Sequence, residues 1–241
     1  MQSRCLFRPL VAVALCAAVG LAALSDPQTA RAADDEWVKL FNGKDLTGWK
    51  MFDPPSGNFK SVKQVKNADG KVTAFVGVNK KDDKEVTLWQ VKDGMIVGGG
   101  PASHIFTELE ADNFHYRVEA KINDKGNSGQ YFRTKFGPNF PAGYEAQINA
   151  THGDKIRTGS LYMPNVKEVL VLDIAPHKAD EFFTQEVIAN DDHIQIIVNG
   201  KKTVDYKDSK KTYTKGHFAL QGHDPGSVMT FKKIEYKPIK K

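Results

Sequence analysis

Hydrophobic and polar residues alternate along most of this chain in short segments, at the two-residue period of a β-strand. In the clearest segment, 113–122, the even positions from Phe114 to Ile122 are apolar and the odd positions from His115 to Lys121 are polar or charged. Segments of the same kind are found at 37–41, 86–91, 95–97, 103–108, 182–189, 193–198, 203–206, 216–223 and 228–236. Because no stretch has the period of a long helix, the pattern predicts an all-β fold, a two-sheet antiparallel β-sandwich.

Short turn motifs separate these segments. Asp93-Gly94 and Asn199-Gly200 each stand between two strand patterns, as is typical of tight β-hairpins. The lysine-rich stretch 53–85 is predicted to be a surface excursion with a hairpin at Asp69-Gly70. The glycine run 98–100 precedes no helical pattern and therefore does not predict a phosphate-binding loop.

The stretch 126–149 differs from the rest of the chain in its polar chemistry. It consists of two extended pieces joined by a loop rich in glycine and proline. In the second piece, alternation places Glu145, Gln147 and Asn149 on one face. Their apolar neighbours are expected to point the other way, into a core.

The first extended piece is expected to present Tyr131 and Arg133 on one face, beside Gly129. Asn, Tyr, Arg, Glu and Gln side chains offer directional hydrogen bonds, as recognition of a hydroxyl-rich ligand requires. The alternative interpretation is that these residues form the solvated side of an antiparallel sheet.

The N-terminal segment has the features of a signal peptide. Arg4 and Arg8 precede an apolar run, and Ala30-Arg31-Ala32 fits a cleavage site. The apolar run is short for a membrane span. We therefore predict a cleavable signal peptide at 1–32, with cleavage near Ala32, and one β-sandwich domain at 33–241. The mature protein is expected to be periplasmic or extracellular.

Composition limits the partners of the mature chain. Both cysteines, Cys5 and Cys16, would leave with the signal, so no disulfide and no cysteine metal site is expected. The formal charge would fall from +5 to about +3, and the lysines are scattered without an aromatic ladder, which argues against nucleic acid as a partner. No membrane span is expected in the mature chain, and the oligomeric state is left open.

No cofactor or metal is expected, because no acidic cluster dense enough for calcium is present. His152 and Asp154 lie close in the sequence and hint at a metal site or an acid–base pair. A surface turn is the simpler interpretation of these two residues.

Several motifs together resemble a known family. They are 40–49 (LFNGKDLTGW), 89–98 (WQVKDGMIVG), 126–133 (GNSGQYFR), 143–148 (GYEAQI), 158–162 (TGSLY), 193–206 (HIQIIVNGKKTVDY) and 220–226 (LQGHDPG). In this order they cover essentially the mature chain, which resembles the exported DUF1080 proteins, now named the 3-keto-disaccharide hydrolase domain. The sequence departs from the family in the lysine-rich stretch 61–84 and at Gly222, where many relatives carry a polar residue.

The resemblance implies a concanavalin-A-like jelly roll with a ligand groove on its concave sheet. It also implies cleavage of a glycoside whose sugar is a ketone at C3: a base removes the C2 hydrogen, the enolate expels the glycosidic oxygen, and water then adds. Ordinary glycosidases use two carboxyl groups instead. Other enzymes of this fold carry Glu-x-Asp-x-x-Glu on one strand. Here the strand reads Glu145-x-Gln147-x-Asn149, which disfavours a retaining glucanase.

Within this family framework, we expect Glu145 and His223 to transfer protons, with His223 as the base. Arg133 is expected to hold Glu145 ionised or to donate to the ketone or enolate oxygen. The expected substrate-binding residues are Asn127, Ser128, Tyr131, Gln147, His152, Tyr162 and Gln221.

Each of these assignments has a simpler alternative. Glu145 and Arg133 would also fit a cross-strand salt bridge, and His223 would fit a turn cap. Because this fold hosts lectins as well as enzymes, a carbohydrate-binding module without catalysis is the alternative function. An oligosaccharide or glycoside is the expected ligand in both cases.

Overall fold

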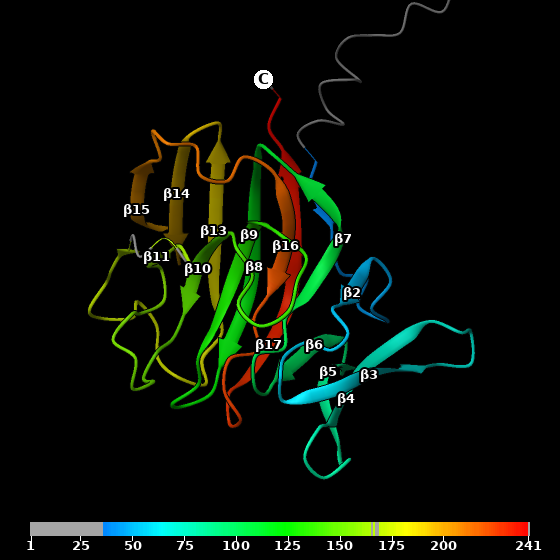
Figure 1. Cartoon of the computed structure of the whole chain (residues 1–241). Helices are drawn as coiled ribbons and strands as arrows, with labels where there is room; N and C mark the ends of the chain where they lie inside the picture. The colour runs from blue at the N-terminus through cyan, green and yellow to red at the C-terminus, as the bar shows by residue number, and fades with distance from the viewer. Residues whose placement is uncertain (1–35, 165, 167–168, 241) are drawn as a thin grey trace, which may run out of the picture.

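The computed structural model describes residues 36–164, 166 and 169–240, and the predicted signal peptide lies outside this part. Two antiparallel sheets pack face to face (Figure 1). The strands are β1 (Val38–Lys39), β2 (Trp49–Met51), β3 (Phe59–Lys66), β4 (Val72–Asn79), β5 (Glu85–Lys92), β6 (Met95–Gly99), β7 (Ile105–Ala111), β8 (Phe114–Ile122), β9 (Ser128–Thr134), β10 (Tyr144–Ile148), β11 (Leu161–Tyr162), β12 (Val169–Leu170), β13 (Phe183–Asn190), β14 (His193–Val198), β15 (Lys201–Lys207), β16 (Gly216–Leu220) and β17 (Val228–Pro238). The predicted all-β sandwich is confirmed.

One sheet has ten strands in the order β15-β14-β13-β8-β17-β6-β5-β4-β3, with β1 paired to β17. The other has seven strands in the order β12-β11-β10-β9-β16-β7-β2. In the described residues no helix is long and apolar enough to cross a membrane.

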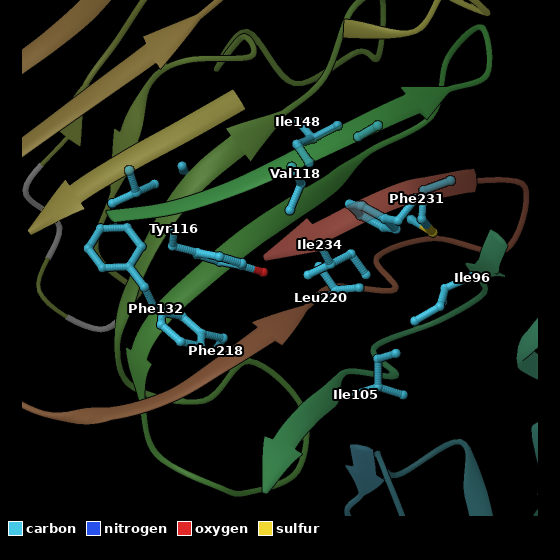
Figure 2. Packing of buried hydrophobic residues seen from close by; sticks show 14 of the residues in the cluster. Ile96, Ile105, Tyr116, Val118, Phe132, Ile148, Phe218, Leu220, Phe231 and Ile234 are labelled. Carbon is cyan, nitrogen blue, oxygen red and sulfur yellow. The ribbon is translucent and has the colours of Figure 1, made fainter. Parts of the chain in front are cut away.

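The core lies between the two sheets and follows from strand alternation. In β8, every second residue from Phe114 to Ile122 is buried, as the sequence pattern predicts. Figure 2 shows Tyr116 of β8 beside Phe132 and Phe218 of the opposite sheet, and the Tyr116 and Phe218 ring centroids are 4.3 Å apart. Each such side chain contributes about 1.5–3 kcal/mol through burial. This core fixes which face of the seven-stranded sheet remains for a ligand.

The hairpins expected from turn motifs are present. Asp93 and Gly94 join β5 to β6 with φ of 52° and 72°, and Asn199 and Gly200 join β14 to β15 with φ of 49° and 77°. Two consecutive residues at positive φ match the right-handed twist of the flanking strands. The lysine-rich excursion forms the β3–β4 hairpin, which extends from the sandwich at the lower right of Figure 1.

The seven-stranded sheet has one face against the core and one turned away, which we call the outer face. In β10, Tyr144, Ala146 and Ile148 belong to the core, as expected from alternation. Glu145 and Gln147 therefore project from the outer face. The polar residues of this stretch are thus separated from the apolar interior by the sheet itself.

Candidate functional site

A row of functional side chains crosses the outer face from strand to strand. Glu145 of β10 pairs with Tyr131 of β9 on one side and with Tyr162 of β11 on the other. Together with residues from neighbouring loops they line a pocket of about 330 Å³. The lining residues are Tyr131, Phe140, Glu145, Gln147, Asp154, Ile156, Tyr162, Pro164, Gln221 and His223. This volume lies at the lower end of the 300–1,000 Å³ range of small-molecule sites.

Glu145 forms the floor of this pocket and is only 2% exposed. Burial raises the pKa of its carboxyl to about 8, and the negative charge of Asp154 adds to the rise, while hydrogen bonds from Tyr131 and Gln221 oppose it. The Gln221 Nε2 also donates to the Tyr131 hydroxyl at 3.0 Å. At neutral pH the carboxyl is therefore mostly protonated, unlike an ordinary surface glutamate.

Gln147 completes the environment of the Glu145 carboxyl. With its amide nitrogen towards that carboxyl, it donates to Glu145 Oε1 at 2.8 Å and to the Ser128 carbonyl at 3.0 Å. The Asn127 side chain lies 3.2 Å from the Gln147 amide and is fully buried. Asn127, which was expected to bind the substrate, therefore contacts Gln147 and does not line the pocket.

Gly129 provides the space that the Glu145 carboxyl occupies. A Cβ at position 129 would lie 2.0 Å from Glu145 Oε1, closer than any real contact. Gly129 pairs with Gln147 across β9 and β10, so it lies directly beside Glu145 on the outer face. A residue without a side chain at this point is what allows the carboxyl to lie against the sheet.

His223 lies at the edge of the pocket, with 28% of its side chain exposed. Asp224 Oδ2 is 2.9 Å from His223 Nδ1 and 3.0 Å from His152 Nε2, so one carboxylate stands between two imidazoles. Within the described residues, His223 Nδ1 and Asp224 Oδ2 make no well-aligned hydrogen bond. Asp224 is thus an electrostatic partner that leaves His223 Nε2 available to a ligand.

His152 contributes to this cluster and not to the pocket lining. Its Nδ1 accepts a hydrogen bond from the Asp154 backbone N–H at 3.0 Å, which directs its Nε2 to Asp224. The surface-turn interpretation of His152 and Asp154 is therefore correct for the backbone. The Asp154 side chain, however, lines the pocket.

The predicted position of Arg133 is wrong, because a β-bulge interrupts the alternation of β9. Tyr131 pairs with Ala219 and Thr134 with His217, so Phe132 and Arg133 together face a single residue of β16. Arg133 has a φ of 48°. The extra residue of a bulge re-aims the side chain that follows, and Arg133 consequently points away from Glu145.

The Arg133 guanidinium instead holds three loops together. It donates to the backbone carbonyls of Asp112 at 2.8 Å, Asp191 at 2.9 Å and Tyr213 at 3.2 Å. Its 2% exposure and these partners make it a buried structural clamp. The Glu145–Arg133 salt bridge considered from the sequence is likewise not formed.

Ser128 also departs from its predicted placement. Its hydroxyl donates to the Gln221 carbonyl at 2.8 Å, and the residue is fully buried. Alternation turns Ser128 towards the core because Gly129 faces outward. Of the predicted residues, the pocket brings together Glu145, His223, Tyr131, Gln147, Tyr162 and Gln221.

Three further residues near the site were not predicted from the sequence: Phe140, Asp224 and His104. Phe140 and Asp224 lie in loops, where strand periodicity does not determine side-chain direction. Asp154, which also lies in a loop, was considered from the sequence only together with His152. His104 precedes β7 on the outer face. Its alternation with Phe106 is a sequence signal that could have identified it. Among residues 36–164, 166 and 169–240, no three His, Cys, Asp or Glu side chains are grouped closely enough to hold a metal ion.

Comparison with solved structures agrees with this architecture. A protein from Parabacteroides distasonis ATCC 8503, named as a candidate glycosyl hydrolase, is 24% identical, with a TM-score of 0.58 over 88% of this chain and 97% of that chain. A second protein of the same name and organism is 20% identical, with a TM-score of 0.56 over 85% and 100%. The carbohydrate-binding module CBM66 from Bacillus subtilis is 15% identical, with a TM-score of 0.52 over 79% and 95%. At these identities the likeness establishes the fold alone, a two-sheet jelly-roll sandwich shared with these proteins.

No curated protein sequence matches the chain. Residues 36–237, which include every strand described above except the last residue of β17, match one family model. The chain therefore belongs to the 3-keto-alpha-glucoside-1,2-lyase-like domain family.

Proposed function

We propose that this protein cleaves the glycosidic bond of 3-keto-glycosides by elimination, followed by addition of water. The observation that carries the proposal is the pairing of a buried carboxyl and an accessible imidazole in one pocket, Glu145 on the floor and His223 at the edge. The family membership supports the same substrate class. A pocket of about 330 Å³ accommodates one sugar ring at the reacting centre.

His223 is the proposed base. It takes the proton from C2 of the keto sugar, and the electron pair of that C–H bond forms the enolate with the C3 carbonyl. Asp224 beside Nδ1 stabilises the imidazolium that results. The C3 ketone makes this proton acidic, which is why an imidazole can remove it.

Glu145 is the proposed acid. With a pKa of about 8 it carries a proton at neutral pH. As the enolate collapses, the C1–O bond breaks and the leaving oxygen takes the proton from Glu145. Water then adds at C1 with Glu145 as base, and His223 returns a proton to C2, so the net reaction is hydrolysis and both groups are restored.

Tyr162 replaces Arg133 as the proposed donor to the enolate oxygen. It lines the pocket next to Glu145, and burial raises the pKa of its phenol, which keeps the hydroxyl protonated. A fixed donor aimed at developing negative charge commonly supplies a large part of the rate enhancement. Tyr131 and Gln147 line the pocket beside the sugar and hold the Glu145 carboxyl in position through their hydrogen bonds.

The decisive assay compares a 3-keto-glucoside with its parent glucoside, using the purified protein from residue 33 onward. We expect release of the aglycone from the keto substrate alone. Glu145→Gln and His223→Ala should each lower the rate by about 10²–10⁴-fold, the usual cost of losing acid–base assistance. Glu108→Gln, which removes an exposed carboxyl from β7 of the same sheet, should retain the activity.

Binding of the sugar without turnover of the keto substrate would favour the lectin-like alternative. Cleavage of the unoxidised glucoside would favour a two-carboxyl glycosidase, in which Asp154, which lines the same pocket as Glu145, would be the second carboxyl. One Asp154 oxygen already accepts the Ile156 backbone N–H at 3.0 Å, which weighs against a nucleophilic role. The same pair of substrates thus separates all three functions.

We also propose that the protein acts after export and signal cleavage near Ala32. The apolar run after Arg4 and Arg8 supports this location. The mass of the N-terminal peptide of the protein isolated from a periplasmic or culture fraction tests it. A peptide that retains residues before 30 would contradict the proposal.

A further inference from the structure

His104 is a buried histidine on the outer face that the proposed mechanism does not use. It immediately precedes β7. Because Ser103 is hydrogen-bonded to Gly222 and Ile105 pairs with Leu220, His104 lies opposite Gln221, the residue that follows β16. It is 2% exposed, and in the described part of the chain neither ring nitrogen has a hydrogen-bond partner. The Gln221 Oε1 next to it also lacks a partner among those residues.

Unpartnered buried groups of this kind are uncommon because each costs about 1–3 kcal/mol. Burial lowers the pKa of His104 to about 3, so its ring is neutral and offers one donor and one acceptor. Its other neighbours are aromatic: the ring lies 4.9 Å from Tyr131 and 6.2 Å from Phe106, centroid to centroid. The polar atoms of His104 and Gln221 are therefore held within an aromatic enclosure next to the pocket.

His217 provides a contrast within the same aromatic cluster. It is 6% exposed and lies 6.4 Å from Phe106. Its Nδ1 is 3.2 Å from the Leu109 carbonyl and its Nε2 is 3.4 Å from Glu110. The fold thus satisfies one buried histidine on this face with its own groups and leaves the other unsatisfied.

Phe140 separates His104 from the pocket. Its ring is 5.8 Å from His104 on one side and 5.3 Å from His223 on the other, and it lines the pocket. Phe140 is 41% exposed and lies in the loop 136–142. The base of this loop is closed by the Lys135 N–H to the Ala142 carbonyl, and the Asn139 N–H bonds to the Pro55 carbonyl. These hydrogen bonds hold the backbone of the loop, whereas the Phe140 ring itself is partly exposed and rests against the two imidazoles.

We propose that His104 and Gln221 form a second sugar subsite, which holds the leaving-group side of the substrate once Phe140 moves aside. This inference rests on the proposed function in one respect, the assignment of the subsite to the leaving-group side of the substrate. The available groups are neutral donors and acceptors beside aromatic rings, which match a hydroxyl-rich ring with apolar C–H faces. They match a phosphate or a carboxylate less well, because the charged group that acts on His104 is the His223 imidazole and not a lysine or an arginine.

The test compares a disaccharide with the methyl glycoside of its first sugar, in wild type, His104→Phe and the matched control His217→Phe. Binding of the unoxidised sugars by calorimetry reports the subsite without turnover. Wild type should bind the disaccharide at least tenfold more tightly than the methyl glycoside. This preference should fall below threefold in His104→Phe and persist in His217→Phe.

Kinetics with the 3-keto forms give the second measurement. His104→Phe should raise KM for the keto disaccharide about tenfold and leave kcat and KM for the keto methyl glycoside within twofold. Absence of keto turnover in wild type would overturn the proposed function but not the subsite, which the binding ratio still decides. An unchanged disaccharide preference in His104→Phe would overturn the subsite. His104→Leu, which likewise removes both the donor and the acceptor, serves the same comparison if the Phe variant does not fold.

Discussion

Replacing Glu145 by Gln should stabilise the protein at alkaline pH while removing its activity. In the folded chain the Glu145 carboxyl has a pKa of about 8, compared with 4.5 for a free glutamate, mainly because burial disfavours its charged form. Between these two values the unfolded chain releases the proton and the folded chain keeps it. The contribution of Glu145 to the free energy of unfolding is therefore fully present below pH 4.5. It declines as the pH rises and is lost by about pH 8.

The size of the effect follows from the same two pKa values. A difference between 4.5 and about 8 corresponds to about 5 kcal/mol in total, lost at about 1.4 kcal/mol per pH unit. The amide introduced by Glu145→Gln has no proton to release, so the stability advantage of the variant should grow by roughly 4 kcal/mol between pH 5 and pH 8. Any change in packing or hydrogen bonding adds an offset that does not depend on pH.

Urea unfolding at each pH unit from 5 to 9, followed by the fluorescence of buried Trp89, measures this difference. Glu108→Gln, with an exposed carboxyl on the same sheet, controls for the loss of a negative charge alone. A stability difference between Glu145→Gln and wild type that stays constant from pH 5 to pH 9 would refute the reasoning. It would mean that the carboxyl is hydrated and ionised in the pocket, and that Glu145 cannot act as the acid.

Three further substitutions test the surroundings of the site. Gly129→Ala places a Cβ where the Glu145 carboxyl lies, so kcat/KM should fall about 100-fold with the fold retained by circular dichroism. Arg133→Met removes the donors to three loop carbonyls and should destabilise the protein by about 3–5 kcal/mol in urea unfolding, with kcat of the folded enzyme within threefold of wild type. Asp224→Asn should lower kcat about tenfold with little effect on KM, because the charge that stabilises the His223 imidazolium is lost. Unchanged kinetics would mean that Asp224 does not act on His223.

The sequence predicted the sandwich because strand alternation and turn chemistry act locally. The apolar stripe of β8 and the paired positive-φ residues of the hairpins each specify their own structure without reference to the rest of the chain. The same local argument placed Glu145 and Gln147 opposite the core. Here the two-residue period holds because β10 is regular over Tyr144–Ile148.

Arg133 shows where that argument fails. The prediction that Arg133 shares a face with Tyr131 assumes an unbroken strand. The bulge opposite β16, however, is created by a register shift between strands far apart in the sequence. No residue in β9 itself indicates the bulge. Asp224 and Phe140 were missed for a related reason, since loops approach the pocket only after the sheet is assembled.

The burial of Glu145 fits an elimination better than an ordinary glycoside hydrolysis. An oxocarbenium-like transition state gains from an ionised carboxylate next to the sugar. An enolate, in contrast, carries negative charge, and an ionised carboxylate beside it would oppose its formation. A carboxyl that stays protonated to about pH 8 avoids this repulsion and holds the proton that the leaving oxygen needs. Burial against Gly129 and Tyr131 therefore supplies both requirements of the proposed route in one residue, Glu145, while Asp154 in the same pocket has one oxygen bound to the Ile156 backbone N–H.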